Sequence, residues 1–273
     1  MRHLDIKPAE NLRHAIESFW YLSVDFAQLP PAGFEILPDG FAEIIFYFGS
    51  PCYLIADNGP MALPSPFLTG LLRKPMYLRA DNHMEVIGIR CYPWAVFDLL
   101  GISSNQGGVH VFEHVIARLH SPLEALVVSG QIAEALARVQ QFFNADCYAV
   151  HSPNALSKAG QAMRQGNGTL PVRHVAEAAH TTLRTLERQF KRAAGQTVKD
   201  VSGLIRFEQV RDQLWTDPET PIAALAQQLG YADQSHLGRE FKRYAGVTVA
   251  AFARKIKRHK LTAHHDFVAF VLS

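Results

Sequence analysis

Two stretches decide the fold of the C-terminal part of the chain: LERQFKRAAGQTV at residues 186–198 and LGREFKRYAGVTV at residues 237–249. Nine of the thirteen positions are identical, which is far more than unrelated segments share and marks an internal repeat. The copies start 51 residues apart, so each has room for one small helical unit. Two copies of a basic helix indicate one recognition element used twice on a periodic polymer, and DNA is the obvious candidate.

Charge is divided unevenly along the 273 residues, a length that suggests two domains. Residues 1–150 contain 9 Lys and Arg against 15 Asp and Glu, whereas residues 151–260 contain 18 Lys and Arg against 9 Asp and Glu. The net charge of +2 therefore hides an acidic half and a basic half. This division is typical of a DNA-binding domain joined to a separate control domain.

The sequence predicts a cytoplasmic protein without membrane contact. No stretch is apolar over the roughly 18 residues that a membrane span needs, and the N-terminus lacks the apolar core of a signal peptide. Three widely separated cysteines, Cys52, Cys91 and Cys147, fit reduced thiols better than a disulfide frame or a zinc site.

Residues 1–110 are predicted to form a mainly-β domain, a small barrel or sandwich with flanking helices. The turn Pro38-Asp39-Gly40 leads into an apolar strand at residues 41–48, because Pro presets φ and Gly accepts a positive φ. Further short strands are expected at residues 52–56, 67–71, 77–80 and 85–92, and helices at residues 11–21 and 93–100.

The rest of the chain is predicted to be helical. Residues 111–150 form a helical linker whose apolar stripe over residues 122–143 fits either a dimer face or packing on the β domain. Residues 151–260 form an all-α domain, and residues 261–273 a C-terminal tail. Within the all-α domain we expect helix-turn-helix units at residues 172–194 and 221–245, a long connecting helix at 198–215, and a closing helix at 249–258.

The stretch IAALAQQLGYADQSHLGREFKRYAGVT at residues 222–248 resembles the signature of the AraC/XylS family of bacterial transcription regulators. The shared pattern is Gly and an aromatic residue at the turn, Asp-x-Ser and Arg-x-Phe-Lys in the second helix, then Gly-x-Thr. Residues 175–198 resemble the family's looser first copy. Two positions depart from the pattern: His180 replaces the Gly often found at the first turn, and Val249 replaces the Pro that usually follows the Thr. The resemblance implies double-stranded DNA and RNA polymerase as partners.

The N-terminal half is more weakly similar to an uncharacterised domain often found ahead of this DNA-binding module. LPDG at residues 37–40, EIIF at residues 43–46 and IGIR at residues 87–90 carry the similarity. It implies a cupin-like β domain that senses a small molecule, which is an inference from fold analogy alone.

The second helix of each unit is expected to enter a major groove, with its early exposed positions facing the base edges. The predicted DNA contacts are Thr182, Arg184, Glu187 and Arg188 in the first unit, and Gln234, Ser235, His236 and Arg239 in the second. Arg can bind guanine bidentately, Gln can pair with adenine, and Glu can accept from cytosine. For Arg188 and Arg239, a phosphate contact or an ion pair between helices is the alternative. The predicted phosphate contacts are Lys191, Arg192, Lys242 and Arg243, near helix C-termini where cations are favoured in any case.

Candidate ligand-binding residues lie in the β domain: Glu43, Arg90, Trp20 and Tyr47. The alternative is that these are half-buried strand positions and core aromatics. No cofactor or metal is expected: the pair His264-His265 fits a solvated tail, and Cys91 fits a buried strand thiol better than a reactive thiolate.

Together these observations predict a sequence-specific DNA-binding regulator that reads two adjacent major grooves under the control of a small molecule. Two alternatives remain open. The N-terminal domain could serve only to form a homodimer, or it could be an enzyme fused to a DNA reader. The chain is not predicted to be an enzyme, because no convergent nucleophile, base or metal motif is evident.

Overall fold

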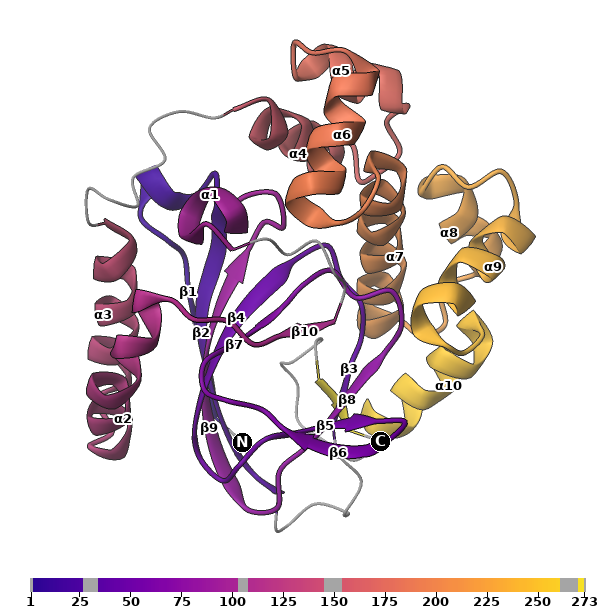
Figure 1. Cartoon of the computed structure of the whole chain (residues 1–273). Helices are drawn as coiled ribbons and strands as arrows, with labels where there is room; N and C mark the ends of the chain where they lie inside the picture. Colours follow the sequence, from indigo (N-terminus) through magenta and orange to yellow (C-terminus); the bar gives the residue numbers. More distant parts are fainter. Residues whose placement is uncertain (1, 27–33, 103–107, 145–153, 261–269, 273) are drawn as a thin grey trace.

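The computed structural model describes residues 2–26, 34–102, 108–144, 154–260 and 270–272 (Figure 1). A β-rich N-terminal part lies beside a helical C-terminal part, as the sequence predicts. Within the described residues, two antiparallel sheets face each other. The first has the strand order β1 (Arg2–Ile6), β2 (Ile16–Asp25), β9 (His83–Cys91), β4 (Ala42–Gly49), β7 (Phe67–Thr69) and β10 (Val109–His110). The second has the order β11 (Phe270–Leu272), β3 (Phe34–Ile36), β8 (Met76–Arg79), β5 (Tyr53–Ala56) and β6 (Gly59–Ala62).

The first sheet is covered on both faces. One face packs against the second sheet in an apolar cluster that includes Trp20, Ile45 and Phe67. The other face packs under α2 (His120–Val128) and α3 (Ile132–Asn144), which lie along its outer side in Figure 1. The apolar stripe of α3 is therefore buried against the β domain, with Phe143 6.1 Å from Phe19 between ring centroids.

The helix expected at residues 11–21 is wrong. The structure has a short 3-10 helix, η1 (Glu10–Leu12), followed by the ten-residue strand β2 between β1 and β9. Both faces of β2 are covered, so apolar side chains occur at four consecutive positions, residues 19–22, and mask the two-residue period of a strand. Residues 270–272, assigned to the tail, form β11 against β3.

The remaining short helices of the N-terminal part are α1 (Val96–Leu100) and the 3-10 helix η3 (Val115–Leu119). The helical domain starts with α4 (Ala155–Gln165). Its first helix-turn-helix unit consists of α5 (Val172–Ala178) and α6 (Leu183–Ala194), and its second of α8 (Ile222–Gln228) and α9 (Gln234–Ala245). The 19-residue α7 (Val198–Thr216) connects them, and α10 (Val249–Lys260) closes the domain. These bounds agree with the predicted ranges to within two residues.

A single apolar cluster runs through both halves of the chain. Trp94 of the β domain lies 5.9 Å from Phe190 of α6 between ring centroids. Gly160 of α4 faces the same indole so closely that a Cβ there would lie 2.0 Å from Trp94. The helical domain is thus packed directly on the β domain.

We expect Phe241→Ala to destabilise the helical domain by roughly 3–5 kcal/mol, because removing a buried ring leaves a cavity. Phe241 is 1% exposed, and its ring lies 5.1 Å from Phe207 and 5.3 Å from Phe252. Chemical denaturation followed by circular dichroism measures the change. The matched control is Lys242→Ala at the next, exposed position of α9. Equal stability of both variants and the natural chain would show that Phe241 contributes no packing energy.

Candidate nucleic-acid interface

The first reading helix, α6, presents its N-terminal half to solvent. Thr182 caps the helix, its Oγ1 accepting from the Thr185 backbone N–H at 3.2 Å. Arg184 and Arg188 are exposed, whereas Leu186 and Phe190 are fully buried. The side chains of Arg184 and Arg188 are therefore free to reach a groove laid along this face.

Glu187 has a partner within the protein. Its carboxylate accepts from the backbone N–H of Val198 at 3.3 Å, and Val198 is the first residue of α7. The first N–H groups of a helix have no partner inside it, so this contact stabilises the start of α7. Of the four predicted contacts on this unit, Glu187 is the one that the structure ties to another element.

The second reading helix, α9, is built in the same way. Asp233 is its N-cap, accepting from the His236 backbone N–H at 2.7 Å. Gln234, Ser235 and Arg239 are exposed. A Cβ at Gly238 would meet nothing within 4 Å, so the surface between Ser235 and Arg239 is open to a close approach.

His236 lies at the edge of this surface. It is half-buried, with its ring edge-on to Tyr231 at 5.3 Å between centroids. Tyr231 in turn donates to Glu240 at 2.9 Å, and the Glu240 carboxylate pairs with Arg206 of α7. His236 thus belongs partly to the contact that fixes α9 on α7.

Three of the four predicted phosphate contacts interact with the protein itself. Lys191 donates to the Gly195 carbonyl at 3.1 Å, Arg243 pairs with Asp200 at 3.3 Å, and the Arg192 guanidinium lies 5.6 Å from the ring of Phe97 in the β domain. Lys242 is exposed. Each of these side chains still carries a positive charge near the end of a reading helix.

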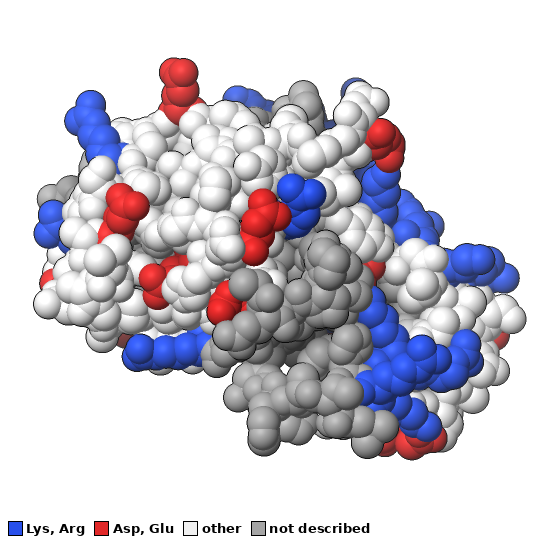
Figure 2. Space-filling model, turned by 90° about the horizontal axis from the view of Figure 1, so that it is seen from below, with Lys and Arg blue, Asp and Glu red and all other residues white. Residues whose placement is uncertain are grey.

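The exposed basic residues of α10 are not among the DNA contacts predicted from the sequence. Arg254, Lys257 and Arg258 are exposed there, and Lys257 pairs with Glu219. Figure 2 shows Lys and Arg side chains gathering on the right-hand side of the molecule, the side of α8 to α10 in Figure 1. The signal in the sequence is the run RKIKRHK at residues 254–260.

The four candidate ligand residues share one face of the first sheet. Glu43 lies opposite Arg90, and Tyr47 opposite Val86, across β4 and β9. Trp20 of β2 lies opposite Gly88, where a Cβ would be 2.0 Å from the indole. This is the face that meets the second sheet, and Tyr47 uses its hydroxyl to donate to the Leu63 carbonyl at 2.5 Å.

Glu43 and Arg90 are also part of a buried charge network between the two domains. The Arg90 guanidinium lies 2.5 Å from Asp39, 3.3 Å from Glu43 and 3.7 Å from Glu208 of α7. These four side chains are 8–18% exposed. Arg90 thus joins carboxylates of the β domain to one carboxylate of the helical domain.

Two arginines of the helical domain complete this network. Arg164 of α4 lies 3.3 Å from Glu208 and donates to the Gly40 carbonyl at 2.7 Å. Arg211 of α7 donates to the Pro38 carbonyl at 3.4 Å. The ring of Phe41 lies within 4.1 Å of the Arg90 guanidinium and 3.7 Å of that of Arg164, measured to its centroid.

Burial raises the pKa of Glu43 to about 7, opposed by Arg90 and reinforced by the nearby Asp39 carboxylate. Burial also raises the pKa of Glu208, opposed by Arg164 and Arg211. Removing a carboxylate from water disfavours its charged form, and three carboxylates share these arginines. The pKa of the Cys91 thiol is raised by burial as well, which fits the predicted unreactive strand cysteine.

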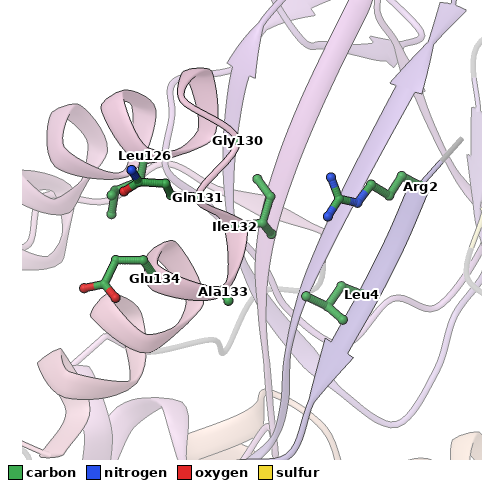
Figure 3. Close-up of a pocket in the computed structure, with 8 residues that line it drawn as sticks. All are labelled: Arg2, Leu4, Leu126, Gly130, Gln131, Ile132, Ala133 and Glu134. Atoms are coloured by element: carbon green, nitrogen blue, oxygen red, sulfur yellow. The ribbon is translucent and has the colours of Figure 1, made fainter.

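A groove of about 750 Å³ lies elsewhere, on the outer side of the β domain (Figure 3). It runs between β1 and the turn from α2 to α3, and none of the four candidate ligand residues lines it. Its lining residues are Arg2, Leu4, Leu126, Gly130, Gln131, Ile132, Ala133 and Glu134. Among the described residues, no three His, Cys, Asp or Glu side chains form a group that could hold a metal ion, and no helix is long and apolar enough to cross a membrane. The pair His264-His265 lies outside the described residues.

The network generates a pH prediction for Glu43→Gln. The folded-state pKa of Glu43 lies above its ordinary value of 4.5, so its contribution to stability is present below pH 4.5 and is lost as the pH rises through about 7. The melting temperature of the variant, relative to the natural chain, should therefore rise by several degrees between pH 5 and pH 7.5. Thermal unfolding across this range measures it, with Glu134→Gln on the exposed face of α3 as control. Parallel curves for Glu43→Gln and the natural chain would contradict the raised pKa.

Comparison with known proteins agrees with this architecture. A family model described as a helix-turn-helix domain matches residues 175–255, and one described as a domain of unknown function, DUF6597, matches residues 4–111. No curated protein matches the chain.

The solved structures that are similar to the chain include the following three. ToxT from Vibrio cholerae is 14% identical, with a TM-score of 0.47, over 86% of this chain and 98% of its own. The C-terminal domain of AraT, a response regulator from Geobacillus stearothermophilus, is 27% identical, with a TM-score of 0.37, over 42% of this chain and 94% of its own. The DNA-binding domain of AdpA, solved with a target DNA, is 20% identical, with a TM-score of 0.37, over 40% of this chain and 99% of its own. The match to a helix-turn-helix family of the AraC type covers both helix-turn-helix units, and the match to a family of unknown function covers the β-rich domain.

Proposed function

We propose that this protein is a transcription regulator that reads two adjacent major grooves of DNA with α6 and α9, under the control of a small molecule bound in the β domain. The observation that carries this proposal is the equivalence of the two reading helices. Both have 12 residues, both start at a side-chain N-cap, and both end at a Gly with positive φ. Arg188 and Arg239 occupy the same position in the two copies, and both are exposed.

The geometry of α7 supports simultaneous reading by both helices. Its 19 residues span about 28 Å at 1.5 Å per residue. Glu240 of α9 binds Arg206 of α7 through both carboxylate oxygens at 3.1 and 2.9 Å, while Glu187 of α6 binds the first turn of α7. Both units are thus fixed to one rigid element, which holds the two reading helices in a set relative orientation.

Control by a small molecule is supported by the shared face of the candidate ligand residues. Glu43, Arg90, Trp20 and Tyr47 line the same side of the first sheet, and Arg90 also contacts α7. A ligand that competes for Arg90 would alter the contact between the two domains. The apolar stripe of α3, which could have formed a dimer face, is already buried on the β domain. This stripe therefore does not support the alternative that the N-terminal domain serves only to form a dimer.

An enzyme would need a metal site or a nucleophile–base cluster around Cys91, Glu43 or His83. Cys91 and His83 stand at opposite ends of the nine-residue β9, about 26 Å apart along the strand. Glu43 pairs with Arg90, and Cys91 is fully buried in the cluster on the other face of the sheet. We propose that the chain acts by binding and not by catalysis.

Selection of duplexes from a random pool by the full-length protein tests this function. We expect two short motifs centred about one helical turn apart, and a binding constant that falls steeply with salt. Capture of fragments from the source genome with the same protein would then locate the sites. Recovery of only one motif, or of no shared motif, would contradict reading of two grooves.

We expect Arg239→Ala to reduce the preference for the selected base at one position by roughly 1–3 kcal/mol, because a bidentate contact to guanine is removed. Binding to the selected duplex and to its single-base variants, measured by fluorescence anisotropy, gives the discrimination. Lys242→Ala is the control, since loss of a phosphate contact weakens all duplexes equally. If Arg239→Ala also weakens all duplexes equally, Arg239 contacts phosphate instead.

A further inference from the structure

The loop between β7 and β8 (residues 70–75, here the bridging loop) lies beside the ends of both reading helices. Arg73 donates from Nε and Nη2 to the side-chain oxygen of Gln196, at 3.0 and 2.7 Å. Pro75 lies near Gly246, since a Cβ placed on this glycine would be 3.8 Å from the proline ring. Gln196 follows α6, and Gly246 follows α9.

These two contacts fall on equivalent places in the internal repeat. Gly195-Gln196-Thr197 and Gly246-Val247-Thr248 align in the two copies. In both, the Gly closes a reading helix with a positive φ of 67° or 72°. In both, the Thr hydroxyl accepts a backbone N–H in the next helix, from Asp200 at 3.1 Å or from Ala251 at 3.2 Å.

The two turns differ in burial, because Gly195 and Gln196 are buried whereas residues 246–248 are exposed. Gln196 is 2% exposed, and its side-chain oxygen receives both donors of Arg73. On the other side, Lys255 of α10, the helix that follows α9, pairs with Glu35 of β3 at 2.7 Å. The β domain therefore holds the turn after α6 and the helix after α9, in addition to its contacts with α7.

We propose that the bridging loop sets the separation and relative rotation of the two reading helices, which makes the β domain a determinant of the spacing between the two DNA motifs. This inference rests on the proposed reading of two grooves. One added base pair moves the second groove by about 3.4 Å and rotates it by about 35°. A restraint on both units that resists a shift and rotation of this size would select among neighbouring spacings.

The test is a spacing selection with the full-length protein and the variant Arg73→Met/Pro75→Gly. Random duplexes bound by each protein are sequenced, and the distance between the paired motifs is counted. We expect one dominant spacing for the natural chain and a distribution broadened by at least one base pair for the variant, with both motifs unchanged. The control is Lys74→Met, which removes one positive charge from an exposed neighbouring position of the same loop and should keep the single spacing.

Hydrogen exchange without DNA separates this proposal from the proposed function. In the variant, the backbone amides of residues 195–197 and 246–248 should exchange several-fold faster than in Lys74→Met, because both turns lose their restraint. Unchanged exchange in both turns would overturn the proposal whatever the DNA result. Faster exchange with an unchanged single spacing would also overturn it. If the natural chain selects no paired motifs, the proposed reading of two grooves is contradicted. The proposed role of the loop in spacing is then contradicted as well, even if hydrogen exchange shows that the loop restrains both turns.

Discussion

Helix α7 is buried on almost every side, and this constraint shapes the rest of the molecule. Both helix-turn-helix units pack on it, and its remaining face lies against the β domain. That face carries Glu208 and Arg211, which are 6% and 3% exposed. A buried charge is costly unless it is paired and hydrogen-bonded. Some of the groups that pair with these two side chains belong to the β domain. The buried charges of α7 therefore have all their partners only when the two domains are in contact.

The turn that the sequence marks as LPDG supplies this contact. Pro38 and Gly40 offer backbone carbonyls to Arg211 and Arg164, and Asp39 binds Arg90. A Cβ at Gly40 would lie 2.5 Å from Nη2 of Arg164, so a larger residue there would displace this guanidinium. This turn, which precedes a strand, thus also binds α4 and α7. Its Asp39 pairs with Arg90, and Arg90 contacts both Glu43 on the inner face of the sheet and Glu208 of α7. These contacts connect the interior of the β domain directly to the helical domain.

Local patterns in the sequence predicted the helical domain well. The repeat, the N-caps Thr182 and Asp233 and the Gly at each helix end act within a few residues of one another, so they can be read without tertiary information. The exposed early positions of α6 and α9 followed from the burial of Leu186, Phe190, Leu237 and Phe241. Strand β2 was missed because a strand covered on both faces has no alternation to detect.

Contacts between residues far apart in the sequence could not be predicted. Arg90 and Glu43 were chosen as ligand residues because they are polar groups on apolar strands, but their pairing with residues 164 and 208 depends on how the domains dock. The place of Glu187 on its helix predicts a DNA contact, but the bond of its carboxylate with the start of α7 could not be predicted. Arg73 had no local signal, since a cation in a loop gives no indication that it reaches Gln196 more than a hundred residues away.

In the proposed complex with DNA, one chain inserts α6 and α9 into adjacent major grooves while α7 stays in contact with the β domain. A crystal structure of the full-length protein with a selected duplex tests this most directly. We expect the N-termini of α6 and α9 to lie in successive grooves on one face of the DNA, with Arg90 still beside Glu208. One helix outside the DNA, or a β domain separated from α7 with both helices inserted, would contradict it.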